Sequence, residues 1–140
     1  MGAIHKFTGD WKEVFTWEGS RTRWIQNDQV SQVSETWLIG KAEGAQNFAV
    51  RYYQIAPGGF SRKEQHAYDH GVLVLQGGGE VLIEASTQEI SKGDLVYIPP
   101  DVLHQFKNTG SGPLGFICVI PAQRKKGGSL VWAEEGIEFD

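Results

Sequence analysis

Short runs of Val, Ile, Leu and aromatic residues, separated by glycine-rich segments, dominate the pattern of apolar and polar positions along this chain. Each run is too short for a stable helix and has the usual length of a strand. The pattern predicts strands at residues 35–39, 48–55, 72–76, 80–84, 95–98, 104–108 and 114–120. Regular short strands with Gly and Pro between them favour an all-β sandwich or barrel.

Turns are predicted where Gly and Pro cluster. Residues 76–80 contain three consecutive glycines and are expected to form a tight hairpin turn. Residues 57–59 and 109–113 are expected to form further turns.

The length of 140 residues fits one domain and leaves no room for a second. The predicted strands occupy residues 35–121. Residues 1–34 carry Trp11, Trp17 and Trp24 among polar residues, which predicts an irregular arm that packs on the barrel or on a partner subunit. A substrate lid is the alternative. Residues 122–140 form a C-terminal extension, and its basic run at 124–126 is expected to be a solvated loop.

Composition excludes several classes of function. Apolar residues make up 40% of the chain, and the net charge of -4 offers no basic footprint for nucleic acid or for an anionic membrane surface. A single cysteine, Cys118, rules out an intrachain disulfide, and its apolar neighbours predict a small buried residue. No run approaches the roughly 20 apolar residues of a membrane helix. With no signal-peptide pattern at the start, a cytoplasmic location is expected.

Ligand-type side chains gather at two places in the sequence. Glu64, His66 and His70 are separated by even numbers of residues, so in extended chain they would share one face. His104 begins a later predicted strand. Three imidazoles and one carboxylate suit Fe, Mn, Ni, Zn or Cu, and do not suit Ca or Mg. On spacing alone, ordinary surface or core histidines remain the alternative.

Two segments resemble the conserved motifs of the cupin superfamily. The first family motif reads G-x5-H-x-H-x3,4-E-x6-G, and this chain has Gly58, Glu64, His66, His70 and Gly77 at matching positions. Glutamate therefore stands where the family's first histidine usually stands, and histidine stands at the usual glutamate position. The inventory of three histidines and one carboxylate is kept.

The second family motif reads G-x5-P-x-G-x2-H-x3-N. The chain matches it with Gly93, Pro99, His104 and Asn108, while Asp101 replaces the usual glycine. Together the two motifs cover roughly residues 45–121. The resemblance implies a single cupin-type β-barrel, also described as a double-stranded β-helix or jelly roll, with an irregular N-terminal arm.

The resemblance also implies one divalent transition metal, with Fe, Mn, Ni or Zn placed ahead of Cu. We expect the ligands to be Glu64, His66, His70 and His104. A three-histidine site with Glu64 unbound or bridged by water, and a barrel with no physiological metal, are the alternatives. Because the swap removes the carboxylate from position 70, Glu64 becomes the candidate catalytic base.

Four aromatic residues are candidates for the surroundings of this site, with ordinary core packing as the alternative, namely Tyr68, Tyr97, Phe106 and Tyr53. The family's breadth implies a metal-dependent enzyme that acts on a small polar or aromatic molecule, with a dioxygenase placed ahead of a lyase, isomerase or decarboxylase. A non-catalytic module that binds a small ligand is the alternative. A homodimer is expected, with no nucleic-acid or membrane partner.

Overall fold

The computed structural model describes residues 2–135, most of which lie in antiparallel strands. The strands are β1 (Arg21–Ile25), β2 (Ser31–Ile39), β3 (Phe48–Phe60), β4 (His70–Gln76), β5 (Gly78–Ile83), β6 (Ser86–Ser91), β7 (Leu95–Ile98), β8 (His104–Lys107), β9 (Leu114–Pro121), β10 (Gln123–Lys126) and β11 (Ser129–Trp132). Two 3-10 helices, η1 (Lys41–Glu43) and η2 (Ala133–Glu135), complete the elements. The predicted all-β class is confirmed. Among the described residues, none of the helices has the length and apolar character needed to cross a bilayer.

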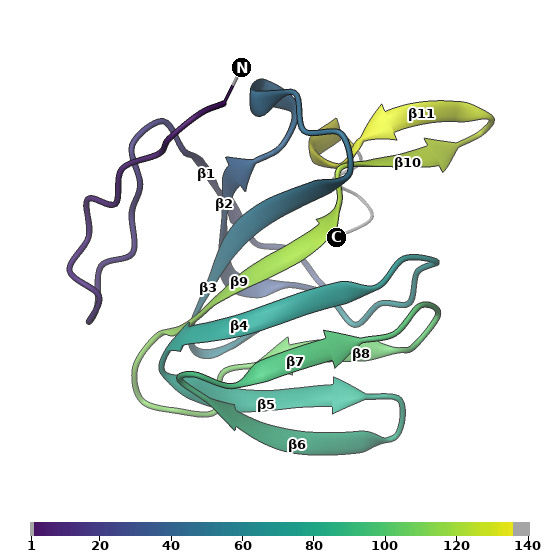
Figure 1. Cartoon of the computed structure of the whole chain (residues 1–140). Helices are drawn as coiled ribbons and strands as arrows, with labels where there is room; N and C mark the ends of the chain where they lie inside the picture. The colour runs from purple at the N-terminus through teal and green to yellow at the C-terminus, as the bar shows by residue number, and fades with distance from the viewer. Residues whose placement is uncertain (1, 136–140) are drawn as a thin grey trace.

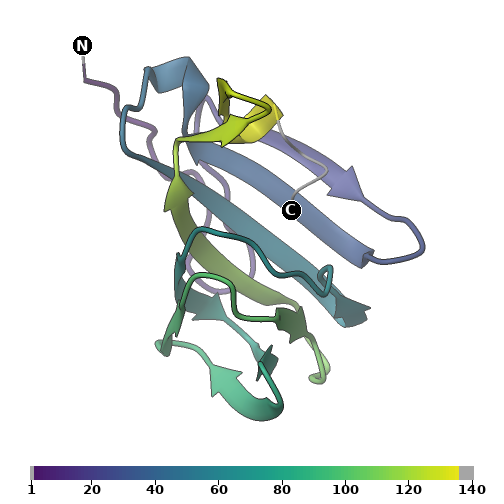
Figure 2. The ribbon, with the colours of Figure 1, turned by 90° about the vertical axis from the view of Figure 1, so that its right-hand side faces the viewer.

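One curled sheet contains most of the strands, in the order β6-β5-β8-β3-β9-β4-β7, and β2 joins it at β3 while β1 pairs with β2. The curl produces a half-barrel (Figures 1 and 2). Burial alternates along β4, where Val72 and Val74 are buried and Leu73 is exposed. The inward side chains of this strand meet those of Ile98 and Phe116 in the core. Period-two patterning therefore places the core inside the curl.

Strand β3 continues through residues 57–59, where a turn was predicted, so that prediction is wrong. Pro57 lacks an N–H for the ladder and Gly58 adopts a positive φ of 81°. The register between β2 and β3 shifts at this point, between the pairs Val33–Ile55 and Ser31–Phe60. The chain absorbs these residues as a bulge and then continues to pair with β8.

The predicted hairpin at residues 76–80 is also wrong. Strand β4 pairs with β7 and β9, whereas β5 pairs with β6 and β8, so β4 and β5 are not neighbours. Gly77 adopts φ 71° where the chain crosses between them, and a Cβ at that position would lie 2.0 Å from the Pro113 carbonyl oxygen. Glycine is required here for backbone contact rather than for a hairpin. The hairpin instead lies between β5 and β6, where Ile83 faces Ser86.

The N-terminal arm packs on the outer face of the sheet and contributes a strand that the pattern did not predict. Strand β1 pairs with β2. Phe15 and Trp17 contact Tyr52, with ring centroids 5.6 and 5.5 Å apart, while Trp11 and Trp24 remain 54% and 76% exposed. Because the arm covers their outer face, neighbouring parts of β2 and β3 are buried on both sides and lose the alternation that marks a one-sided strand.

The basic run at 124–126 is not the loop that was predicted. Strands β10 and β11 form an antiparallel hairpin in which Arg124 faces Val131. Figure 1 shows this hairpin, in yellow-green, projecting from the end of β9. Residues 136–140 of the predicted C-terminal extension lie outside the described residues.

Candidate metal centre

Two histidines that are close in sequence and a third from a later strand meet at one end of the half-barrel. His70 is the first residue of β4, His104 is the first residue of β8, and His66 lies in the segment that precedes β4. One ring nitrogen from each lies within 4.8 Å of the others. Backbone pairing produces this arrangement, because the Glu64 and His104 amides each donate to the other residue's carbonyl, at 3.0 and 2.9 Å.

The outer ring nitrogens orient these imidazoles. The Nδ1 atoms of His66 and His104 lie 3.1 and 2.9 Å from the carbonyl oxygens of Tyr68 and Val102. A carbonyl oxygen only accepts, so Nδ1 carries the hydrogen and the Nε2 lone pair points toward the cluster. Metal-binding histidines commonly have this arrangement. His70 uses Nδ1 differently, since that atom lies 3.3 Å from the sulfur of Cys118.

Polar atoms around the cluster fit a cation. The Nε2 atoms of His66 and His70 are 2.9 Å apart. Two nitrogen lone pairs at this distance repel each other unless a proton or a metal ion lies between them. His104 Nε2 is buried without a hydrogen-bond partner, and so is Oε2 of Glu64. Such orphaned groups are costly unless something binds them. The donor set of imidazole nitrogens and one carboxylate suits a transition metal.

Glu64 borders the histidine cluster. Its Oε1 atom lies 3.7 Å from Nε2 of both His66 and His104. Burial would raise the pKa of Glu64, but the two neighbouring imidazoles outweigh it and the pKa is lowered. Glu64 is therefore an ionised carboxylate beside the three nitrogens, positioned either as a fourth ligand or as a base.

His70 is held neutral. Its burial, followed by the positive charge of Arg51, lowers the pKa of His70 from 6.5 to about 2. Only a neutral imidazole offers a lone pair to a metal. The surroundings of His70 thus keep it in the form that a ligand requires.

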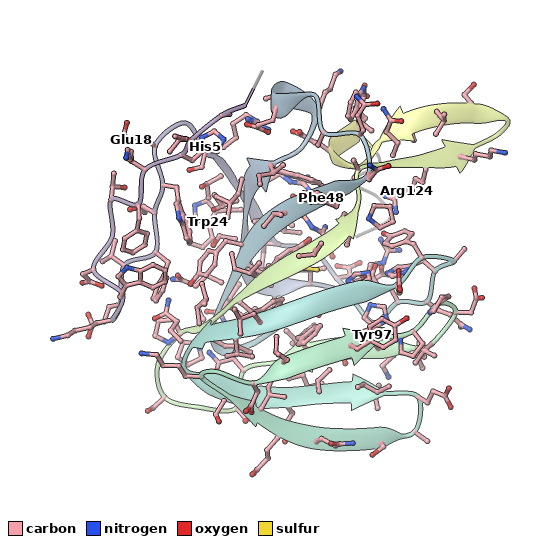
Figure 3. The ribbon with its side chains drawn as sticks, viewed as in Figure 1. His5, Glu18, Trp24, Phe48, Tyr97 and Arg124 are labelled. Atoms are coloured by element: carbon pink, nitrogen blue, oxygen red, sulfur yellow. The ribbon has the colours of Figure 1, made fainter. Side chains whose placement is uncertain are left out.

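A cavity of about 340 Å³ opens beside the histidines. Its walls are largely apolar, and they include Phe106 and Tyr53, two of the residues expected around the site. Tyr68 lies outside this cavity, where its ring stacks on His66 at a centroid distance of 4.0 Å. Tyr97 does not line it: that side chain is 60% exposed and donates to Asp69 on the outer surface (Figure 3).

A buried polar network behind the cavity was missed from the sequence. Glu35 and Arg51 are 0% and 1% exposed, and Arg51 Nη1 donates to Glu35 Oε2 at 3.3 Å. Tyr53 donates to the same oxygen at 2.5 Å. Arg51 also reaches the sulfur of Cys118 at 3.5 Å, which connects the network to His70. The signal was present, because Arg51 has the inward parity of Ala49 and Tyr53 along its strand.

Cys118 is buried, as predicted, with 2% of its surface exposed. Its role is larger than that of a small apolar residue, because its sulfur contacts both His70 and Arg51 and lines the cavity.

The chain is thus an all-β protein built on a curled half-barrel, with three converging histidines whose arrangement fits a metal ion. Residues 51–120 match the Cupin domain family, and the chain belongs to that family. The predicted family and fold are thereby confirmed.

A relative with a named activity and several solved structures resemble the chain. A 1-methylthio-D-xylulose 5-phosphate methylsulfurylase of Rhodospirillum rubrum is 38% identical over 77 residues, which cover 55% of this chain and 49% of that protein. The chain thus matches about half the length of this relative. The cupin-2 domain Rru_A2000 of Rhodospirillum rubrum superposes with a TM-score of 0.74 at 29% identity, covering 82% of this chain and 78% of that one. A cupin 2 conserved barrel protein of Rhodopseudomonas palustris has a TM-score of 0.77 at 27% identity, covering 97% and 91%.

Proposed function

We propose that this protein is a metal-dependent enzyme that converts a small polar molecule bound in the 340 Å³ cavity. The observation that carries the proposal is the convergence of three imidazole nitrogens within 4.8 Å at the edge of that cavity. His66, His70 and His104 would hold one divalent metal, and Fe, Mn, Ni and Zn are the candidates ahead of Cu. When bound, such an ion polarises a substrate oxygen or activates water.

The residues around the cluster divide the remaining work. Glu64, an ionised carboxylate at the boundary of the cavity, accepts a proton from the substrate. Phe106 and Phe116 exclude water from one wall, which strengthens electrostatic interactions inside. Arg51 places a guanidinium at the back of the cavity, where Glu35 holds it, while Tyr53 donates its one hydroxyl hydrogen to Glu35. Preorganised donors of this kind stabilise developing negative charge.

Non-redox proton transfer, as in an isomerase or a lyase, is the reaction class that Glu64 favours. The methylsulfurylase relative is named for a sugar-phosphate substrate, which agrees with a polar, oxygen-rich ligand. A dioxygenase is the second candidate. It is favoured by histidines beside a carboxylate at the edge of an apolar cavity, because ligands of these two kinds hold ferrous iron in non-haem oxygenases.

Metal loading tests the centre directly. Purified protein is incubated with Fe²⁺, Mn²⁺, Ni²⁺, Zn²⁺ or Cu²⁺ and the metal per chain is measured by elemental analysis. We expect one ion per chain, and His104→Ala should weaken binding by at least about tenfold. His5→Ala is the matched control, because His5 pairs with Glu43 far from the cluster. Equal metal content in His104→Ala and His5→Ala would contradict the centre.

Turnover separates the two reaction classes. Each metal form is offered carbonyl compounds, phenols and sugar acids with and without oxygen, and both oxygen uptake and product are recorded. Product formation under anaerobic conditions identifies the non-redox class, whereas obligatory oxygen uptake identifies the dioxygenase. Glu64→Gln is expected to lose activity, and a variant that keeps both its metal and full activity would remove Glu64 from the mechanism. Metal binding without turnover of any of these compounds would instead identify a ligand-binding module.

A further inference from the structure

A second hollow lies beside the metal centre and is strongly basic. This cleft, of about 690 Å³, runs between the segment at residues 62–68 and the root of the β10–β11 hairpin. Four cations line it, two from each side: Arg62, Lys63, Arg124 and Lys125. The net charge of the whole chain is -4, so this concentration of positive charge is local.

The cleft is built into the same wall as the metal centre. Arg62 and Glu64 line both the cleft and the cavity that His70 and His104 line, while His66 lines the cleft. Glu64 is the one carboxylate in the cleft lining, and its Oε1 atom is near His66 and His104. A ligand that contacts the four cations in the cleft is therefore separated from the histidine cluster by little more than the Glu64 side chain.

Stacking fixes the position of one cation. The Arg124 guanidinium donates to the Tyr68 hydroxyl and lies over the Tyr68 ring at 4.8 Å. The Tyr68 ring in turn stacks on His66, with the two planes 6° apart. Figure 3 shows Arg124 at the root of the hairpin. Arg124, Tyr68 and His66 thus stack one on the next, which connects the cleft to the histidine cluster. Because this stacking fixes the Arg124 guanidinium in place, the group is preorganised to bind an anion.

We propose that this cleft binds a phosphate group of the substrate, while the reacting part of the same molecule enters the metal cavity. Phosphate binding in the cleft stands by itself, whereas the entry of the reacting part into the metal cavity rests on the proposed function. Four cationic side chains around one cleft give it a positive local potential, which attracts a dianion more strongly than a monoanion. On each side of the cleft an arginine offers a guanidinium fork that can bind two phosphate oxygens, and a lysine adds a compact positive charge. The substrate class is thus a small phosphorylated molecule.

Phosphate binding is measured without metal, so the result does not depend on the metal centre. Inorganic phosphate is titrated calorimetrically into chelator-treated protein at constant ionic strength, and acetate is titrated in parallel. We expect saturable phosphate binding, roughly tenfold weaker in Lys63→Gln/Lys125→Gln, both sites being exposed. The matched control, Lys12→Gln/Lys92→Gln, removes two exposed lysines that do not line the cleft and should bind as the parent does.

Each outcome decides the proposal. Absence of saturable binding, or equal affinity in the two double variants, overturns it, and acetate binding as tightly as phosphate overturns the assignment to phosphate. Elemental analysis of the same samples after metal loading keeps the two proposals separate. If the protein binds phosphate but no metal, the phosphate site is supported and the metal centre is not. If it binds metal but no phosphate, the phosphate site is overturned and the metal centre is supported.

Discussion

The buried ion pair of Glu35 and Arg51 offers a quantitative test of the structure. Glu35 has no exposed surface and accepts hydrogen bonds from Arg51, Tyr53, Trp37 and Arg23, the last at 2.7 Å. Removing one member of a buried ion pair leaves the other charge uncompensated, which costs about 3–5 kcal/mol. Glu35→Gln keeps the shape and removes the charge, so we expect a loss of this size.

Such a loss is large for one domain, whose free energy of unfolding is typically about 5–15 kcal/mol. At this chain length it corresponds to a decrease in Tm of roughly 10–20 °C. Urea unfolding followed by circular dichroism at pH 7.5, with chelator present, gives the free energy directly. Glu89→Gln is the control, because Glu89 is exposed on β6 and its substitution should change stability by less than about 0.5 kcal/mol.

A double variant tests whether the cost arises from the pair. Arg51→Met added to Glu35→Gln removes the uncompensated cation and replaces it with a shorter, unbranched apolar side chain. Buried pairs replaced in this way are often close to neutral, so the double variant should be more stable than Glu35→Gln alone. A loss below about 1 kcal/mol in Glu35→Gln, or strictly additive losses in the double variant, would refute this account of the network.

Three further predictions follow from other residues. The surroundings of His70 hold its pKa at about 2 in the folded protein, so on acidification the unfolded chain binds a proton that the folded chain does not. Between pH 7.5 and 5.5 the free energy of unfolding of the metal-free protein, measured by urea unfolding, should therefore fall by about 1.4 kcal/mol more than that of His70→Gln. An equal fall in both proteins would contradict this prediction. Asn108→Ala removes the side-chain hydrogen bonds to the buried Ile55 carbonyl and to the Gly112 carbonyl, both at 2.8 Å, and should lower the unfolding free energy by about 2–3 kcal/mol in the same assay. Leu95 and Tyr97 stand 80% and 60% exposed on an apolar outer face, so light scattering should give a homodimer that Leu95→Asp converts to a monomer.

Sequence patterns predicted the parts of the fold that depend on local spacing. Strand β7 was predicted with its observed bounds, and the histidines cluster because the motif positions put His70 and His104 at strand starts and His66 just before β4. The predictions failed where contacts between residues distant in sequence determine the path of the chain. Gly77 looks like part of a hairpin locally, yet it forms a crossing that the Pro113 carbonyl imposes. Nothing near that glycine in the sequence specifies this contact.

Side-chain direction set the second limit. Tyr97 was expected near the site as an aromatic in a motif strand, but the two-residue period directs it outward to Asp69. Glu35 and Arg51 lie in strands buried on both faces, where charge normally indicates solvent. Their mutual compensation depends on the pairing of β2 with β3, which brings together residues that the sequence separates.

The side chains of the candidate metal centre come from two separate stretches of the chain, residues 64–70 and the start of β8, which are joined there by backbone hydrogen bonds such as those between Glu64 and His104. Under the proposed function, an ion bound by both stretches would act as a crosslink that adds to these hydrogen bonds and closes a long loop. Removing that ion with a chelator should therefore loosen the backbone shared by the two hollows, and amide hydrogen exchange along residues 61–69 should rise with no substrate present.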